Sequence, residues 1–230
     1  MAEVRGLIFD FNGTLLFDSP LHIAAFRRCF EARGMDVPSN EVMIRDLFGM
    51  PNAAIYKKFF NANADEAEIE AFIVEKEELY KSFFLEELQS RRLCEGAEEL
   101  LDYLKESSVP YAIATGSEYS TLLFYIKHLG LDRWFTLDNI VYTDGNFNGK
   151  PAPDIYRIAA SRIGLTAEEC AVFEDGTSGI RAARAANAGR VFALYEQGFT
   201  PELPAPLTVD KTLHSLKSWK DLLGEIDLYR

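Results

Sequence analysis

The stretch Val4-Arg5-Gly6-Leu7-Ile8-Phe9-Asp10-Phe11-Asn12-Gly13-Thr14 decides the fold class. Residues 4–9 form a short, mainly apolar run that ends at Asp10, and Asn12-Gly13 is a turn signal. This pattern predicts a buried strand with polar side chains at its carboxyl end. Similar short runs occur at residues 111–114, 171–173 and 191–194, and we interpret them as further strands.

Helical patterns separate these predicted strands. Apolar side chains recur at helical spacing in residues 100–104 and again in residues 155–163. Strands that alternate with helices predict an α/β fold, with a Rossmann-like parallel sheet covered by helices on both faces. The prolines of residues 201–206 predict a surface loop, which we expect to precede a last strand and a C-terminal helix.

Residues from about 18 to 92 break this alternation, because they hold several helical patterns and no convincing strand. Phe26, Cys29 and Phe30 lie at helical spacing, and apolar residues between 69 and 84 repeat the pattern. We expect an all-helical insertion with an apolar core of its own. The acidic residues between 65 and 70 are most simply a solvated helix face.

The composition is that of an acidic globular protein. Of the 230 residues, 24 are basic and 36 acidic, which gives a formal net charge of −12. Such a chain lacks the positive field that binds nucleic acid or anionic membranes, so we expect neither as a partner. Cys29, Cys94 and Cys170 are odd in number and far apart, which argues against a disulfide scaffold. No signal peptide or membrane-length apolar run is evident, so we expect a cytoplasmic protein.

Four polar clusters fall at predicted strand ends. In a doubly wound sheet, ligands bind outside the carboxyl ends of the strands, so these clusters are expected to meet. They are Asp10 to Thr14, Thr115-Gly116-Ser117, Lys150 in Gly149-Lys150-Pro151-Ala152-Pro153-Asp154, and Glu174-Asp175-Gly176. Each cluster alone is also typical of an ordinary turn.

Together the clusters supply the groups for phosphoryl transfer to a carboxylate. Asp10 would attack phosphorus, and a divalent metal held by Asp10 and Asp175 would offset the repulsion between the two anions. Oxygen ligands and a phosphate favour Mg²⁺. Thr115 would hydrogen-bond the transferred phosphoryl group, and Lys150 would supply positive charge.

The four clusters, in this order and spacing, resemble the haloacid dehalogenase (HAD) superfamily, in its phosphatase and β-phosphoglucomutase-like branch. The resemblance spans residues 4 to about 195 and implies a Mg²⁺-dependent enzyme with an aspartyl-phosphate intermediate. It implies that Asn12 binds metal through its backbone carbonyl and that Glu174, beside Asp175, holds a metal-bound water. Gly116 and Ser117 are expected to contact the substrate phosphate.

The resemblance also implies that residues 18–92 form a helical cap over a HAD-like core made of residues 1–17 and 93–230. His22 matches a histidine often found at the cap entrance, where a substrate or proton-relay contact and an ordinary half-buried position are about equally expected. The cap loop, residues 48–52, makes Gly49 and Asn52 candidate substrate contacts.

Asn12 departs from the family pattern, which has a second aspartate at this position. That aspartate protonates the leaving oxygen and later activates water, and an amide does neither, so we expect chemistry slowed by about 10²- to 10⁴-fold. Three explanations stay open: an inactivating change in a phosphatase, a substrate whose leaving group needs no proton, or a protein that binds a phosphorylated metabolite without turnover. Asn12-Gly13 also predicts deamidation, which would restore an aspartate.

Because Asp10, Lys150 and Asp175 are all present, we expect a Mg²⁺-dependent hydrolase of phosphatase type that acts on a small phosphorylated metabolite with reduced efficiency. A β-phosphoglucomutase-like phosphomutase is the alternative, although the loop of residues 48–52 lacks the arginine that this resemblance calls for. Lys57 and Lys58 lie near that loop but are most simply solvated helix residues, as is Arg45. A non-catalytic phosphometabolite-binding protein is the rival from another class.

Overall fold

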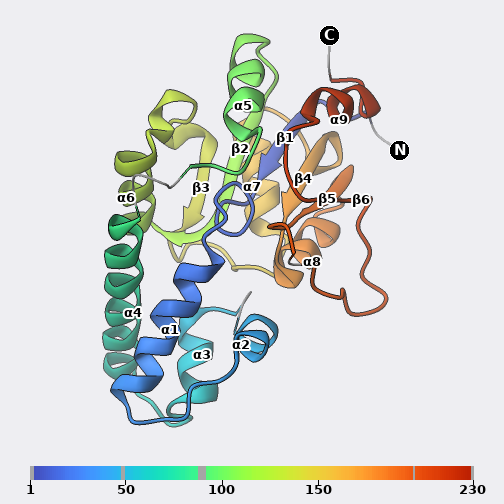
Figure 1. Cartoon of the computed structure of the whole chain (residues 1–230). Helices are drawn as coiled ribbons and strands as arrows, with labels where there is room; N and C mark the ends of the chain where they lie inside the picture. Colours follow the sequence, from blue (N-terminus) through green and yellow to red (C-terminus); the bar gives the residue numbers. More distant parts are fainter. Residues whose placement is uncertain (1–2, 48–49, 88–91, 199, 229–230) are drawn as a thin grey trace. The chain divides into compact units, whose positions relative to one another are not determined.

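The computed structural model describes residues 3–47, 50–87, 92–198 and 200–228 (Figure 1). The chain divides into two compact units. Residues 1–17 together with 92–230 form one, which we call the core unit, and residues 18–91 form the other, which we call the helical unit. Among the described residues, no helix has the length and apolar content that a bilayer crossing demands.

The core unit contains a parallel sheet with helices packed around it. Its strands are β1 (Gly6–Phe9), β2 (Tyr111–Glu118), β3 (Ile140–Thr143), β4 (Cys170–Glu174), β5 (Arg190–Leu194) and β6 (Lys211–Leu213). Its helices are α5 (Ala97–Glu106), α6 (Tyr119–Leu129), α7 (Asp154–Arg162), α8 (Thr177–Ala185) and α9 (Trp219–Glu225), with short 3-10 turns η2 (Leu131–Arg133), η3 (Leu137–Asn139) and η4 (Ala167–Glu169). The α/β fold with a Rossmann-like parallel sheet, predicted from the sequence, is confirmed.

The sheet order β3-β2-β1-β4-β5-β6 positions the polar clusters. The chain builds outward from β1 in one direction and then returns to build outward from it in the other, so Leu7 of β1 pairs with Tyr111 of β2 on one side and with Ala171 of β4 on the other. At such a reversal the connections leave in opposite directions, and a crevice opens at the carboxyl ends of the two central strands. Those ends are Phe9 and Glu174.

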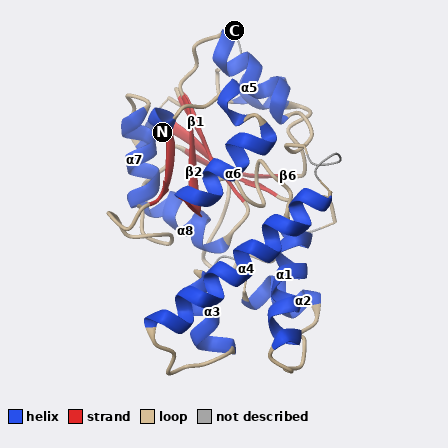
Figure 2. Cartoon of the chain, turned by 90° about the vertical axis from the view of Figure 1, so that its left-hand side faces the viewer, coloured by secondary structure: helices blue, strands red, loops and turns tan. Residues whose placement is uncertain are grey.

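Both faces of the sheet are covered, as Figure 2 shows for the helices on either side of the strands. Alternate strand residues point to opposite faces. One face packs against α7 and α8 through a buried cluster that includes Ile8, Val172, Tyr156 and Ile180. The intervening residues point the other way, where the rings of Phe9 and Phe173 stack with centroids 4.8 Å apart. The central strands are therefore apolar on both sides, which is why each is read as an uninterrupted hydrophobic run.

The strands differ from the sequence prediction in two places. β2 does not stop at residue 114 but continues to Glu118, and its pairing with β3 shifts register between Ala114 and Glu118. The hydroxyl of Thr143 donates to the Gly116 carbonyl at 3.1 Å, which anchors this irregular end. β3 itself was not predicted, because an edge strand of four residues with a polar end carries little periodic signal.

The helical unit has its own apolar core. Its helices are α1 (Ser19–Ala32), α2 (Asn40–Asp46), α3 (Asn52–Phe59) and α4 (Glu66–Glu86). The core of this unit is formed by Phe26, Cys29, Phe30, Met43, Leu47, Ile55, Tyr56, Ile69 and Phe72. Among the described residues of this unit there is no strand.

The start of α4 accounts for the acidic run between residues 65 and 70. The Asp65 carboxylate accepts the Glu68 amide at 2.9 Å, and the Glu68 carboxylate accepts the Asp65 amide at 3.2 Å, so the two close a capping box. The acidic side chains here are exposed. The interpretation of this run as a solvated helix face is confirmed, and two of its members also start the helix.

Candidate active site

Lys150 joins two carboxylates at the carboxyl end of the sheet. Its ammonium donates to Asp10 Oδ1 and to Glu174 Oε1, each at 2.6 Å. Asp10 follows β1 directly, and its amide donates to the Phe173 carbonyl at 2.9 Å, so β1 and β4 stay paired up to the site. The side chains of Asp10 and Lys150 are only 11% and 13% exposed, so these charges interact with little screening by water.

Glu174 accepts four hydrogen bonds. Besides Lys150, the Tyr156 hydroxyl donates to Oε1 at 2.7 Å, and the backbone amides of Asp175 and Gly176 donate to Oε2 at 2.9 and 2.8 Å. A Cβ at Gly179 would lie 1.6 Å from Oε1, so only glycine leaves room for this carboxylate. Glu174 is thus fixed in place and in turn orients the Lys150 ammonium.

Asp175 completes a cluster of three carboxylates. Oxygens of Asp10, Glu174 and Asp175 all lie within 4.8 Å of one another. Thr14 donates to Asp175 Oδ1 at 3.1 Å. At Gly13, φ is +77° and an added Cβ would lie 2.1 Å from Asp175 Oδ2, so this turn requires glycine on two counts.

The donor chemistry of this cluster suits a hard divalent cation. Two buried carboxylates, Asp10 and Glu174, and the half-buried Asp175 face one ammonium, which leaves an excess of negative charge. Their oxygens are the ligand type that Mg²⁺ prefers. Because Glu174 already accepts four donors, Asp10 and Asp175 are the carboxylates best placed to bind an ion directly. This acidic cluster can therefore hold a metal.

The pKa values reflect the same charge imbalance. Burial raises the pKa of Asp10 to about 7, with Glu174 adding to the rise and Lys150 opposing it. Burial and the neighbouring carboxylates also raise the pKa of Asp175 well above its usual range. Burial disfavours the charge on Lys150, but attraction to Asp10 and Glu174 prevails and raises its pKa. Lys150 therefore stays charged. A bound cation would reduce the repulsion among the three carboxylates.

Asn12 is held by two side chains of the core unit. Its Nδ2 donates to the Tyr125 hydroxyl at 2.6 Å, and its Oδ1 accepts from the Ser117 hydroxyl at 2.8 Å. These two partners fix the amide plane and connect the first polar cluster to the second. The backbone amide of Gly13 donates to the Leu16 carbonyl at 2.8 Å, so the turn after Asn12 is closed as well.

Thr115 lies at the same edge of the sheet as Asp10. Ile113 pairs with Phe9, so Thr115, two residues further along β2, lies beyond the end of β1. Its side chain is buried, and its hydroxyl accepts the Ser117 amide at 3.1 Å. Gly116 between them is exposed. The contact of these three residues with a phosphoryl group remains a prediction.

The two described candidates of the helical unit, His22 and Asn52, belong to a polar cluster around Lys76. Lys76 is only 3% exposed, and its ammonium lies 2.9 Å from His22 Nδ1 and 2.8 Å from Glu77 Oε1. Asn52 donates to the same Glu77 oxygen at 3.2 Å. Gly49, the third candidate in this segment, falls outside the described residues.

His22 has a partner on each ring nitrogen. Nε2 lies 3.3 Å from Asp18 Oδ2, and the ring stacks on Tyr80 with centroids 4.3 Å apart. The Tyr80 hydroxyl donates to the same Asp18 oxygen at 2.5 Å. Because the Lys76 ammonium can only donate, Nδ1 accepts and the ring proton on Nε2 faces Asp18. This is the half-buried, hydrogen-bonded position that the sequence left open.

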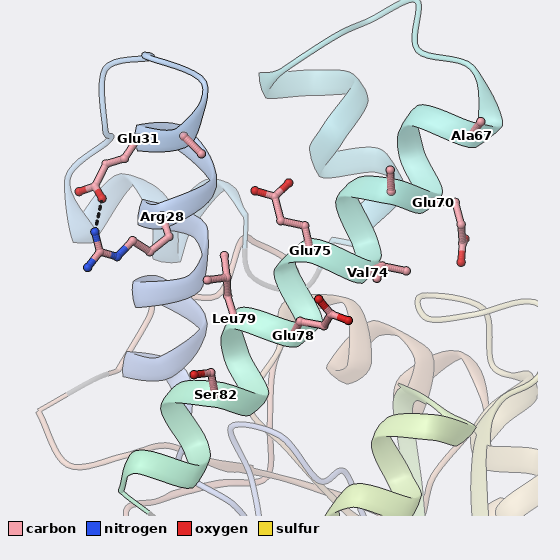
Figure 3. Close-up of a pocket in the computed structure, with 11 residues that line it drawn as sticks. Arg28, Glu31, Ala67, Glu70, Val74, Glu75, Glu78, Leu79 and Ser82 are labelled. Atoms are coloured by element: carbon pink, nitrogen blue, oxygen red, sulfur yellow. Dashed lines mark hydrogen bonds and ion pairs between the residues drawn. The ribbon is translucent and has the colours of Figure 1, made fainter.

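A groove with a volume of about 1170 Å³ lies in the helical unit, between α1 and α4 (Figure 3). Figure 3 shows Leu79 directed from α4 toward α1, and Val74, Glu70 and Glu78 projecting from the other side of α4. None of the predicted site residues lines it. Its size therefore does not identify the reaction site, which we place at the carboxylate cluster of the core unit.

The sequence predicted that Asp10, Lys150, Glu174 and Asp175 would lie close together, because the carboxyl ends of parallel strands meet at one edge of a sheet. The structure places these four residues in one cluster. Tyr156, Tyr125 and Lys76 were not among the predicted residues. Tyr156 lies inside α7, and its only signal is that it shares the buried face of that helix. Lys57 and Lys58, the lysines considered near residues 48–52, are exposed.

Comparison with known proteins agrees with this geometry. A family model described as haloacid dehalogenase-like hydrolase matches residues 4–187. The chain belongs to this family. Fructose-1-phosphate phosphatase YqaB of Escherichia coli is 33% identical over 183 residues, 79% of this chain and 92% of that protein. The phosphorylated carbohydrates phosphatase of Thermotoga maritima is 30% identical over 191 residues, 83% of this chain and 85% of that protein.

A solved structure extends the likeness of this HAD-like hydrolase to nearly its whole length. The crystal structure of a HAD hydrolase, family IA, variant 3, from Entamoeba histolytica has a TM-score of 0.86 and 31% identity, and covers 98% of this chain and 99% of that one. The assignment to the phosphatase branch of the HAD superfamily, made from the four clusters, is thereby confirmed.

The raised carboxyl pKa values predict how the metal-free protein responds to pH. A carboxyl with a raised pKa binds more protons in the folded than in the unfolded state, so its contribution to stability falls as pH rises. For Asp10 this loss occurs between about pH 4 and about pH 7, and for Asp175 it has the same sign. We expect Asp175→Asn, which removes one charge, to raise the free energy of unfolding in EDTA by about 1–3 kcal/mol near pH 8. Near pH 5 the gain should be smaller.

Denaturant unfolding of the parent chain and of Asp175→Asn, with EDTA and with excess Mg²⁺, measures these changes in the free energy of unfolding. The parent chain should gain stability from Mg²⁺ at the higher pH, and Asp175→Asn should gain much less. Equal Mg²⁺ effects on both proteins would contradict the assignment of Asp175 as a ligand.

The contacts of Asn12 predict that the folded protein resists deamidation. The reaction needs the Gly13 nitrogen to attack the Asn12 side-chain carbon and expel ammonia, but that nitrogen and both amide atoms are engaged. Peptide mapping should show slow conversion in the folded chain and faster conversion in denaturant. A Ser117→Ala, Tyr125→Phe double variant should convert faster while folded. Equal rates for folded and unfolded protein would contradict the protection.

Proposed function

We propose that the chain is a Mg²⁺-dependent phosphatase of small phosphorylated metabolites that works through an aspartyl phosphate on Asp10. The observation that carries the proposal is the Lys150 ammonium, 2.6 Å from both Asp10 and Glu174, beside the Asp175 carboxylate. Phosphoryl transfer requires a nucleophile, positive charge and oxygen ligands for a metal in one place. The names of the two phosphatase relatives support phosphorylated sugars as the first compounds to test.

In this mechanism each core residue has a defined task. Asp10 attacks phosphorus through the oxygen that Lys150 leaves available, while Lys150 balances the charge of the nucleophile and of the transferred group. Thr115 and the backbone amides of Gly116 and Ser117 bind phosphoryl oxygens. Mg²⁺ would be held by Asp10, Asp175 and the Asn12 carbonyl, with Glu174 alongside, and would supply positive charge between the two anions.

The helical unit is proposed to act as a cap. In this proposal residues 18–92 cover the core of residues 1–17 and 93–230 during transfer, which would exclude bulk water from the reaction. His22, Gly49 and Asn52 would contact the part of the substrate that is not transferred. The Lys76 cluster supports this proposal, because it holds His22 directly and Asn52 through Glu77.

Asn12 limits the rate in this proposal. An amide neither gives a proton to the leaving oxygen nor takes one from water, so we expect Asn12→Asp to increase phosphate release from sugar phosphates by about 10²- to 10⁴-fold. The Ser117 and Tyr125 hydroxyls can both donate to a carboxylate, so the variant should fold normally. Asn63→Asp, an exposed asparagine of the helical unit, is the matched control for the added charge.

The effect of Asn12→Asp is measured as the rate of phosphate release from a panel of sugar phosphates with Mg²⁺. Asp10→Asn should abolish release in either background. No release by the parent or by Asn12→Asp would favour the phosphometabolite-binding rival, and isomerisation of glucose 1-phosphate with a bisphosphate activator would favour the phosphomutase.

A further inference from the structure

Three hydrogen-bond donors near Asp10 are engaged with the carboxylates of the site. In the described part of the core unit, the Lys150 ammonium is shared by Asp10 and Glu174. The Tyr156 hydroxyl donates to Glu174, and the Thr14 hydroxyl donates to Asp175. Each of these three donors therefore has at least one carboxylate of the site as its hydrogen-bond partner.

The remaining polar groups near the nucleophile are poor acids. Asn12 is an amide held between the hydroxyls of Tyr125 and Ser117. Amides and aliphatic hydroxyls do not release protons near neutral pH, and a phenol does so only near pH 10, roughly where free tyrosine ionises. Glu174 accepts four hydrogen bonds, so both of its oxygens are engaged. Asp175, the remaining acidic group, is taken as a metal ligand in the proposed function, and a carboxyl group that binds a metal is deprotonated.

The histidine of the helical unit does not fill this gap. Nδ1 of His22 accepts from Lys76, and its Nε2 faces Asp18. Both ring nitrogens are thus engaged within the helical unit itself. The described residues thus include a nucleophile, Asp10, and a cation, Lys150, for attack on phosphorus. Among them we identify no acid that would protonate the leaving oxygen.

Without an acid, the leaving group must depart without being protonated. An alcohol leaves as an alkoxide unless it is protonated, whereas a carboxylic acid has a pKa of about 4 and leaves readily as its anion. We propose that the phosphoryl donor suited to this site is a small acyl phosphate, and that the phosphoryl group then persists on Asp10. The proposal rests on the proposed function, because it takes Asp10 as the nucleophile.

The first step balances without an acid. An oxygen of Asp10 forms a bond to phosphorus, and the bond from phosphorus to the acyl oxygen breaks. The electron pair leaves with the carboxylate, and no proton moves. Lys150 stays bonded to the nucleophile and to Glu174 throughout, so the positive charge needed for the approach of two anions remains in place.

The second step is the slow one. A water oxygen bonds to phosphorus, the bond to Asp10 breaks, and the Asp10 carboxylate is restored while the water gives up a proton. The amide of Asn12 cannot accept that proton, so it passes to solvent or to the phosphate itself. Without a base this step loses about 10²- to 10⁴-fold, and the aspartyl phosphate accumulates.

Acid-quenched intact-mass measurements test both steps. The parent chain, Asn12→Asp, Asp10→Asn and the Asn63→Asp control are mixed with Mg²⁺ and either acetyl phosphate or a hexose 6-phosphate. The parent should gain one phosphoryl group rapidly from acetyl phosphate and far more slowly from the hexose phosphate. After donor removal, the adduct should decay about 10²- to 10⁴-fold more slowly in the parent than in Asn12→Asp.

Each outcome decides between the two proposals. If Asn12→Asp uses both donors while the parent is labelled by acetyl phosphate alone, the inference is supported. If the parent takes phosphate from both donors at the same relative rates as Asn12→Asp, the inference is overturned and the phosphatase stands. If no protein forms an adduct at Asp10 or releases phosphate from either donor, the proposed function itself fails.

Discussion

The buried ammonium of Lys150 is the interaction on which the core site depends. Asp10 and Glu174 are buried, with the half-buried Asp175 beside them, and unpaired carboxylates in such a place are costly. Lys150 offsets part of this charge, and Tyr156 with two backbone amides stabilises the rest of Glu174. The imbalance that remains raises the pKa of Asp10 and Asp175. An arrangement that is strained electrostatically when metal-free is well prepared to bind a cation.

The sequence predicted the parts of this site that follow from strand geometry. Asp10, Thr115 and Glu174 lie at or just beyond the ends of apolar runs, and parallel strands bring such ends together. Lys150 lies farther from a strand, after β3, and was singled out because of the order of the four clusters. Tyr125 was beyond reach, because it is 113 residues from Asn12 and lies on an amphipathic helix with no feature of its own. The contact between the Tyr125 hydroxyl and the Asn12 amide depends on tertiary packing alone.

Lys76 is a different case, because a signal was present. The buried face of α4 runs through Ile69, Phe72, Lys76 and Tyr80 at spacings of three and four, so the lysine interrupts an apolar stripe. A charged residue at such a position predicts a buried ammonium with partners, here His22 and Glu77. Lys57 and Lys58 were considered because of their place in the chain, whereas periodicity was the better guide.

The position of β1 in the sheet affects how this protein is made. β1 is synthesised before the other strands of the sheet and lies in its middle, yet its neighbours β2 and β4 are synthesised only after the whole helical unit. Domains tend to fold as units during synthesis, and unpaired strands are prone to aggregation. The nascent chain must therefore keep an apolar strand unpaired while a self-contained helical segment folds behind it, and any truncation before residue 170 leaves that strand permanently open on one side.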